Sequence, residues 1–109
     1  MQACLRMDFS PDKADAALGT LRSILERIRV QTGCLSCSVY LDTEIENRII
    51  FSQEWRNEED LQNHLRSDEY RQVLLIMETA ITPPEIRFDT LISSSGVEVI
   101  EKARTKKGN

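Results

Sequence analysis

The sequence is poor in aromatic residues and in the side chains that most often do chemistry. Of its 109 residues only 6% are Phe, Trp or Tyr, and it has one Trp and one His. No apolar run approaches the roughly 18 residues of a membrane-spanning helix, and the start MQACLRMDFS lacks the basic-then-apolar plan of a signal peptide. Hydrophobic residues make up 40% of the chain, enough for one modest core. We therefore expect a soluble, cytoplasmic, single-domain protein with no membrane partner.

Cysteine is also scarce, and its spacing offers little for a metal or redox site. The three cysteines are Cys4, Cys34 and Cys37, an odd count that argues against a secreted disulfide scaffold. A zinc site needs about four ligands, so Cys4 and His64 would have to converge on the CLSC pair by coincidence. That pair follows Gly33 and opens a strand-like run, where no helix N-terminus lowers the thiol pKa. We expect ordinary buried thiols and no metal.

Basic residues are few outside the end of the chain. The formal net charge is −4, but four of the 14 basic side chains lie in the last eight residues, at Lys102, Arg104, Lys106 and Lys107. Residues 1–101 therefore carry 10 basic and 18 acidic side chains, and such an acidic body repels phosphate backbones. We expect no nucleic-acid partner, and we interpret 96–109 as a C-terminal extension that ends in a frayed basic tail.

Hydrophobic periodicity divides the chain into strands and helices. Alternation predicts strands at 4–9, 35–42, 48–55 and 85–92, and helical spacing predicts helices within 11–32, 58–66 and 68–82. Ser10, Asn57 and Ser67 are the expected N-caps of these helices, and Gly33 is the expected left-handed cap that closes the first one. The run VEVIEKAR, residues 97–104, fits either a fifth strand or a helical turn.

The order of these elements is β-α-β-β-α-β, with the second helix interrupted once. This is the split βαβ arrangement of a ferredoxin-like α+β fold, an antiparallel sheet with helices on one face, over residues 1–95. The other face would then expose an apolar patch, either Leu35 with Val39 or Ile49 with Phe51. The same face of a second copy is the economical cover for such a patch, so we expect a homodimer.

Three stretches, in this order along the chain, resemble a known family. They are GCLSCSVYLD after the first helix, EWRNEEDLQNHLRSDEY in the middle, and PPEIRFDTL at the last strand. Together they resemble the antibiotic-biosynthesis monooxygenase domains of the dimeric α/β-barrel group, over roughly residues 3–93. Because this fold hosts several unrelated chemistries, the resemblance implies the fold more strongly than the activity.

The resemblance implies cofactor-free oxidation of an activated aromatic, such as a hydroquinone or an anthrone, to a quinone by molecular oxygen. Deprotonation gives an electron-rich anion that can itself reduce O₂, so the protein supplies a proton acceptor, donors that hold the anion, and a dry pocket. The implied partners are a small aromatic substrate and O₂, with no cofactor. Haem degradation is disfavoured, because that branch places an iron-ligating His near the position of Leu74, and this chain has no second His. The alternative is a non-catalytic dimeric barrel protein that binds a small metabolite or a partner protein.

The only histidine is the first candidate for catalysis. Leu61, His64 and Leu65 share one helix face, which points to the interior. From the residues alone, a core histidine hydrogen-bonded to the backbone is the simpler interpretation. The resemblance, in which this helix borders the pocket, favours His64 as the catalytic base. An ordinary pKa of about 6.5 would leave it ready to take a proton at neutral pH.

Two further residues complete the predicted catalytic set. The resemblance implies that Tyr70 hydrogen-bonds the substrate. Arg87 is the best cationic candidate for steadying an oxyanion, whereas its alternation with Glu85 and Asp89 is more typical of a surface salt-bridge ladder. Trp55 has packing as its default role. The predicted substrate pocket is lined by Trp55, Phe51, Leu61 and Leu74.

Overall fold

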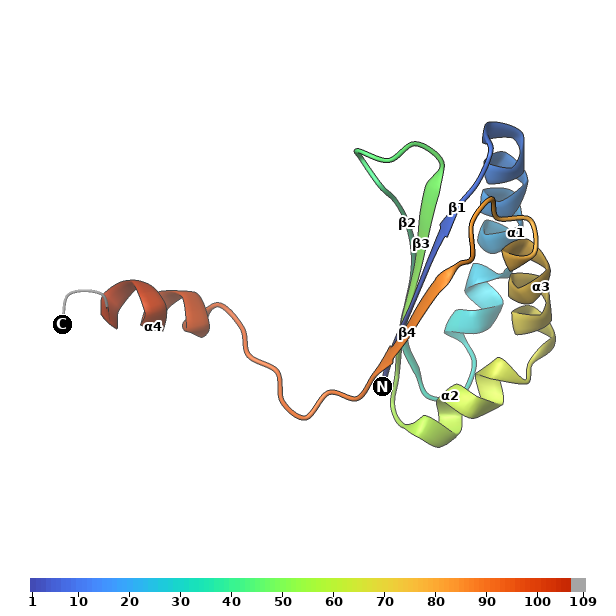
Figure 1. The fold of residues 1–109 in the computed structure, drawn as a ribbon. Helices are drawn as coiled ribbons and strands as arrows, with labels where there is room; N and C mark the ends of the chain where they lie inside the picture. Colours follow the sequence, from blue (N-terminus) through green and yellow to red (C-terminus); the bar gives the residue numbers. More distant parts are fainter. Residues whose placement is uncertain (107–109) are drawn as a thin grey trace.

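The computed structural model describes residues 1–106, and its elements follow the predicted order (Figure 1). The strands are β1 (Gln2–Asp8), β2 (Cys34–Leu41), β3 (Arg48–Trp55) and β4 (Glu85–Asp89). The helices are α1 (Pro11–Arg29), α2 (Glu58–Leu65), α3 (Asp68–Met77) and α4 (Glu98–Lys106). The ferredoxin-like α+β fold is confirmed, and the run 97–104 is largely helical. Residues 107–109, the end of the predicted basic tail, lie outside the described part.

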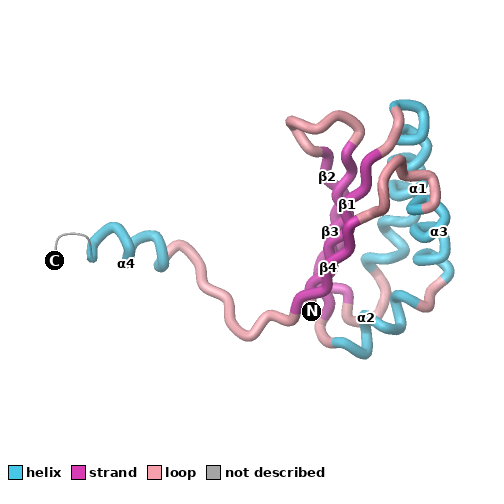
Figure 2. Tube along the Cα trace, viewed as in Figure 1, coloured by secondary structure: helices cyan, strands magenta, loops and turns pink. Residues whose placement is uncertain are grey.

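The four strands form one antiparallel sheet in the order β2-β3-β1-β4, so β2 and β4 are its edges. Helices α1, α2 and α3 lie on one side of this sheet, which we call the covered face (Figure 2). The opposite, open face meets no other described element. This layering gives the protein a single core between sheet and helices.

The core occupies the covered face. Leu5 on β1 lies opposite Phe51 on β3, and Met7 lies opposite Ile49. These four side chains are at most 4% exposed. Helix α1 packs a stripe of buried residues at helical spacing against them, namely Ala14, Ala17, Leu21, Ile24 and Ile28. At its start, the Ser10 hydroxyl donates to Asp12 at 2.9 Å and does not cap the helix as predicted.

Residues with small side chains lie where the chain turns, after α1 and at the N-termini of α2 and α3. Asn57 accepts a hydrogen bond from the Asp60 N–H at 2.8 Å, and Ser67 accepts one from the Tyr70 N–H at 3.2 Å, as predicted for N-caps. Gly33 has the expected positive φ, 80°. A Cβ at this position would also overlap the Asp60 side chain. Both the conformation and the close approach therefore require glycine.

The open face is not the apolar patch that was predicted. Ile49 and Phe51 point toward the helices, and Val39, which pairs with Phe51, packs against the same core. Leu35 is 60% exposed beside a bulge in β2. The reason is that Ile49, Phe51 and Trp55 form the larger apolar set of β3, and burying that set removes more apolar area from water.

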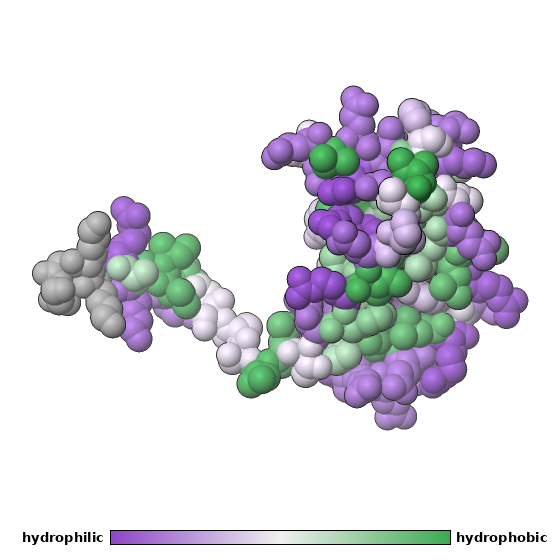
Figure 3. Space-filling model, in the orientation of Figure 1, coloured by the Kyte–Doolittle hydropathy of each residue, from purple (hydrophilic) through white to green (hydrophobic). Residues whose placement is uncertain are grey.

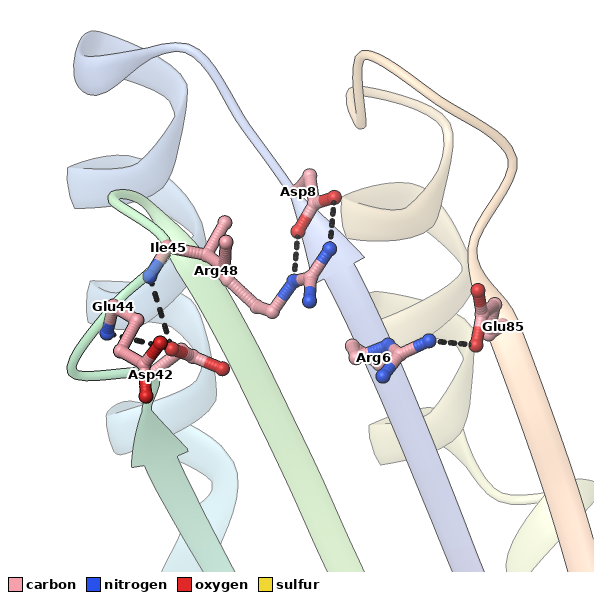
Figure 4. Close-up of polar contacts among 7 residues, drawn as sticks. All are labelled: Arg6, Asp8, Asp42, Glu44, Ile45, Arg48 and Glu85. Carbon is pink, nitrogen blue, oxygen red and sulfur yellow. Dashed lines mark hydrogen bonds and ion pairs between the residues drawn. The ribbon is translucent and has the colours of Figure 1, made fainter.

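Ion pairs occupy the open face instead (Figure 4). Arg48 donates two hydrogen bonds to Asp8, at 2.6 and 2.9 Å, and thereby holds the pKa of that carboxyl below its ordinary value. Arg6 pairs with Glu85 across β1 and β4. Tyr40 lies opposite Ile50 on this face and is 55% exposed. The open face is thus mainly polar.

Beyond β4 the chain leaves the body as an extended arm that ends in α4 (Figure 1). We use the word arm for residues 90–106. Figure 3 shows hydrophobic side chains at its beginning and on α4. Five of its apolar residues are 48–98% exposed: Leu91, Ile92, Val97, Val99 and Ile100. None of the helices in residues 1–106 is long and apolar enough to cross a membrane.

Candidate functional site

The only histidine and the only tryptophan of the chain meet beneath the covered face. Trp55 ends β3, His64 lies in the last turn of α2, and Tyr70 lies in the first turn of α3. The His64 ring stacks on the Trp55 indole with a centroid distance of 4.5 Å and an interplanar angle of 25°. Tyr70 approaches the imidazole edge-on at 5.2 Å. We call these three residues the histidine–aromatic cluster.

The break between α2 and α3 brings the cluster together. Within one continuous helix, residues six apart lie on different faces. Here Arg66 ends α2 and Ser67 starts α3 with its own N-cap, so the chain turns between His64 and Tyr70. Both side chains consequently reach the interior, where they are 2% and 9% exposed.

His64 makes one hydrogen bond and leaves one ring nitrogen unpaired. Nδ1 lies 2.7 Å from Oε1 of Gln31. Nε2 is buried and has no hydrogen-bond partner among residues 1–106. Buried polar atoms are nearly always paired, and an unpaired one costs about 1–3 kcal/mol. The unpaired Nε2 therefore either binds a ligand or lowers the stability of the folded protein.

Burial also changes the acid–base properties of His64. Desolvation disfavours the charged imidazolium, although Glu69 favours it, and the net effect lowers the pKa of His64 to about 4. The predicted ordinary value of about 6.5 is therefore wrong for the folded protein. The imidazole is neutral at pH 7, so its unprotonated nitrogen is free to accept. Its protonated form, however, needs a nearby anion to stabilise it.

A small apolar cavity lies beside the cluster. Tyr70 lines it together with Phe51, Gln53 and Phe88, and its volume is about 10 Å³, close to the space of one water molecule. Gln53 is buried and accepts a hydrogen bond from the Trp55 indole N–H at 2.9 Å. Ile86 and Phe88 of edge strand β4 also line the cavity, and they are 39% and 46% exposed.

Four larger hollows lie on the described part of the protein, and two of them bear on the site. A polar hollow of about 250 Å³ borders His64 and is lined also by Gln31 and Asp60. A groove of about 340 Å³ runs between α1 and α3, past Ala17 and Leu75. The groove does not include any residue of the histidine–aromatic cluster. The apolar cavity is the one whose lining suits an aromatic ring, because it is bordered by Tyr70, Phe51 and Phe88.

The structure brings most of the predicted site residues together. Trp55, His64 and Tyr70 are in contact, Leu61 is buried in the same core, and Phe51 lines the apolar cavity with Tyr70. Two predicted residues, Arg87 and Leu74, lie elsewhere.

Arg87 and Leu74 are not part of the cluster. Arg87 pairs with Cys4 on the open face, its side chain is 76% exposed, and its guanidinium lies 3.4 Å from Asp89. Leu74 is 47% exposed on the outer side of α3. Strand alternation explains why Arg87 lies on the open face, because its neighbours Ile86 and Phe88 face the cavity. The surface-pair interpretation of Arg87 fits this position, whereas a direct role beside His64 does not.

Sequence patterns gave no signal for Gln31 or Glu69. Gln31 follows α1 and contacts both His64 and Glu69, at separations of 33 and 38 residues. Amphipathic periodicity identifies apolar faces but not polar pairs between separate elements. The only available hint was Gln53, a polar residue on the otherwise apolar face of β3.

Cys34 and Cys37 have no sign of nucleophilic activation. Cys37 is buried in the core, and burial raises its pKa to about 12. Burial also raises the pKa of Cys34. A reactive thiol needs the opposite shift. Cys4 is exposed on the open face, away from the other two.

The fold and the cluster define a small α+β domain with a buried histidine and aromatic side chains between its helices and sheet. A family model described as antibiotic biosynthesis monooxygenase matches residues 3–74. The chain belongs to this family.

Solved structures share its architecture. A conserved protein from Methanosarcina mazei is 24% identical, with a TM-score of 0.73 over 79% of this chain and 86% of that one. A crystal structure of an antibiotic biosynthesis monooxygenase is 23% identical, with a TM-score of 0.70 over 84% of this chain and 99% of that one. At these identities the likeness shows the fold alone.

One curated relative extends well beyond the aligned region. The uncharacterized protein sll1783 of Synechocystis sp. is 29% identical over 62 residues, which are 57% of this chain and 42% of that protein. The match thus spans less than half the length of the relative.

Proposed function

We propose that this protein is a cofactor-independent monooxygenase that oxidises an electron-rich aromatic, of the quinol or anthrone type, with O₂. The family membership supports the general class. The observation that carries the proposal further is the unpaired Nε2 of His64, a neutral, buried acceptor packed against Trp55 and Tyr70. Such a nitrogen suits the removal of a proton from a substrate in a site from which water is excluded.

The reaction balances without a separate reductant. His64 takes a proton from the hydroxyl of an anthrone in its enol form, which gives the same delocalised anion as loss of the methylene proton, and the carbon of that anion supplies the electrons that reduce O₂. A C–O bond forms to give a peroxide anion, which takes the proton back from His64. Loss of water from the hydroperoxide then leaves the ketone, so one oxygen atom enters the product and the other leaves as water. The low pKa of His64 fits this order, because the imidazolium exists only beside the anion that it creates.

Substrate binding requires the apolar cavity to open and to extend past Tyr70 to His64, which does not line it. A cavity of about 10 Å³ does not hold an aromatic ring. Ile86 and Phe88 belong to an edge strand and are partly exposed, so their side chains are the ones free to turn outward. The Tyr70 hydroxyl would then supply the polar contact to the bound ring that the family resemblance implies.

The test compares two buried residues of the same helix. His64→Ala is expected to lower oxygen uptake with a menadiol- or anthrone-type substrate by about 10²–10⁴-fold, the usual loss for a positioned base. Leu61→Ala, its control, is expected to lose about 2–5 kcal/mol of stability while the folded fraction retains its uptake. Thermal unfolding reports the folded fraction of each variant. Wild-type oxygen uptake by a folded His64→Ala protein would contradict the catalytic role of His64, whereas no oxygen uptake by the wild-type protein would favour the non-catalytic binding protein.

We also propose that the protein is a homodimer, with support from the arm and not from the open face. The arm exposes five apolar side chains, including Ile92 at 98% and Ile100 at 59%. A second copy would remove these side chains from water. Sedimentation at micromolar concentration should give a dimer, and the double change Ile92→Asp with Ile100→Asp should give a monomer. A wild-type monomer at that concentration would refute the proposal.

A reducing compartment such as the cytoplasm is the location that we propose. Its support is the set of three free thiols, of which Cys4 is exposed. Labelling of all three thiols in freshly isolated, denatured protein would agree with this location, and a disulfide would argue against it.

A further inference from the structure

A series of contacts between polar side chains leads from His64 to the surface. Oε1 of Gln31 lies 2.7 Å from Nδ1 of His64, and Nε2 of Gln31 donates to Oε1 of Glu69 at 2.8 Å. The other carboxylate oxygen of Glu69 lies 3.7 Å from Nε of Arg27. The end of α1, the end of α2 and the start of α3 meet at these contacts.

Glu69 determines which way the amide of Gln31 faces. An ionised carboxylate only accepts hydrogen bonds, so the group of Gln31 beside it must be the NH₂. The amide oxygen is then left to face the imidazole. The backbone of Gln31 is held as well: its N–H donates to the Ile28 carbonyl at 3.0 Å, and its carbonyl accepts from the Cys34 N–H at 3.1 Å. The amide therefore has one favoured position and one favoured orientation.

The orientation of Gln31 determines the tautomer of His64. An amide oxygen accepts and never donates, so Nδ1 of His64 must carry the proton. The other neutral tautomer would set two lone pairs against each other at the 2.7 Å that separates Nδ1 from Oε1. With the proton on Nδ1, Nε2 is an unprotonated acceptor. This is the buried atom that has no partner within residues 1–106.

We propose that Glu69 and Gln31 are positioning residues that fix His64 as its Nδ1–H tautomer, and that the Nε2 lone pair so presented selects ligands with a weakly acidic O–H or N–H donor. The ligand class rests on the proposed function, in which the donor is the hydroxyl of a quinol or of the enol form of an anthrone. The tautomer does not rest on it. A ring of the same shape without a donor leaves Nε2 unpaired, and a site of this kind rejects such an analogue.

The tautomer can be measured directly, because His64 is the only histidine in the chain. Protein labelled with ¹⁵N-histidine gives the signals of one imidazole in a nitrogen–proton correlation spectrum. At pH 7 we expect a single neutral form with the proton on Nδ1. A proton on Nε2, or an even mixture of both forms, in the folded wild-type protein would overturn the proposal.

Glu69→Gln tests whether the carboxylate sets the direction. The new amide can donate or accept, so Gln31 is free to turn round and His64 loses its single tautomer. The control is Asp68→Asn, which removes the same charge from the same helical turn at a side chain that is 89% exposed. We expect a mixture of tautomers in Glu69→Gln and the wild-type spectrum in Asp68→Asn. An unchanged spectrum in Glu69→Gln would remove Glu69 from the proposal.

Activity separates this inference from the proposed function. With a quinol substrate, kcat of Glu69→Gln should fall by between about twofold, for an even mixture of tautomers, and about 10⁴-fold, for a complete switch. KM should change little, because Glu69 does not line the apolar cavity. If the wild-type protein has the Nδ1–H form but no oxygen uptake, the oxygenase function fails and the positioning role stands. If it has uptake with the proton on Nε2, the positioning role fails and the function stands.

Discussion

On the covered face of the sheet, β3 carries Ile49, Phe51, Gln53 and Trp55, all at most 4% exposed, whereas its alternate residues on the open face all retain contact with solvent. One residue of displacement along the strand thus separates a dry environment from a wet one. On the dry side, Gln53 is paired with the Trp55 indole, and the unpaired nitrogen of His64 lies against the same ring.

The open face carries more charge but less potential for chemistry. Its pairs, such as Arg87 with Asp89, are exposed, and water screens their attraction. A single neutral imidazole on the covered side has its pKa lowered to about 4. Desolvation, rather than the number of charged groups, therefore distinguishes the candidate site from the rest of the surface.

The largest effect on stability is expected from Trp55→Ala. This change removes the indole on which His64 stacks and the donor to Gln53, and it leaves a cavity in the core. Loss of a buried aromatic costs about 3–5 kcal/mol. Tyr40→Ala removes an aromatic from the open face at a residue that is 55% exposed, and should cost about 0.5 kcal/mol or less. Urea unfolding measures both, and equal losses would show that the two faces do not differ as described.

The pH dependence of stability should show the next largest effect. The folded pKa of His64 is about 4, against 6.5 for an exposed histidine, so between these values the unfolded chain binds a proton that the folded protein does not. The contribution is fully present above pH 6.5 and is lost as the pH falls toward 4, by roughly 3 kcal/mol in total.

His64→Gln provides the matched control, because its side chain does not titrate. Its unfolding free energy should fall less steeply than that of the wild type between pH 6.5 and 4.5. The carboxylates that also titrate in acid, such as Asp8, are common to both proteins. Parallel curves would mean that His64 is solvated in the folded state and that the apolar environment is incorrectly described.

The strands, helix ends and turns were predictable because each depends on residues that are close together in the sequence. Alternation identified the strands, and the caps at Asn57 and Ser67 marked the break that places His64 and Tyr70 together. Gly33 was required by its positive φ. The placement of Leu61 and His64 on one buried face also followed from helical spacing.

The features of the site that the sequence did not predict depend on contacts between elements far apart in the chain. Gln31 lies 33 residues from His64 in the sequence. Hydrophobic periodicity does not predict a hydrogen bond between the amide of a loop residue and the imidazole of a helix residue. The pKa of His64 depends on depth of burial, which the pattern of a helix face does not measure. Arg87 is different, because strand alternation places it on the face opposite Ile86 and Phe88. Its position was predictable once it was known that Ile86 and Phe88 face the helices.

The smallest effect is expected from Arg87→Gln, which tests the open face for function. The side chain is 76% exposed, and among the described residues it forms an ion pair with Asp89 at 3.4 Å. Exposed pairs contribute about 0–1 kcal/mol, so the unfolding free energy should change by less than that. Oxygen uptake should equal that of the wild type, since the guanidinium lies on the opposite side of the sheet from His64. The matched control is Asp89→Asn, which removes the other half of the pair. A large loss of uptake in Arg87→Gln alone, with stability retained, would mean that Arg87 reaches the site of a second copy, and the contrast between the two faces would then hold only for the single chain.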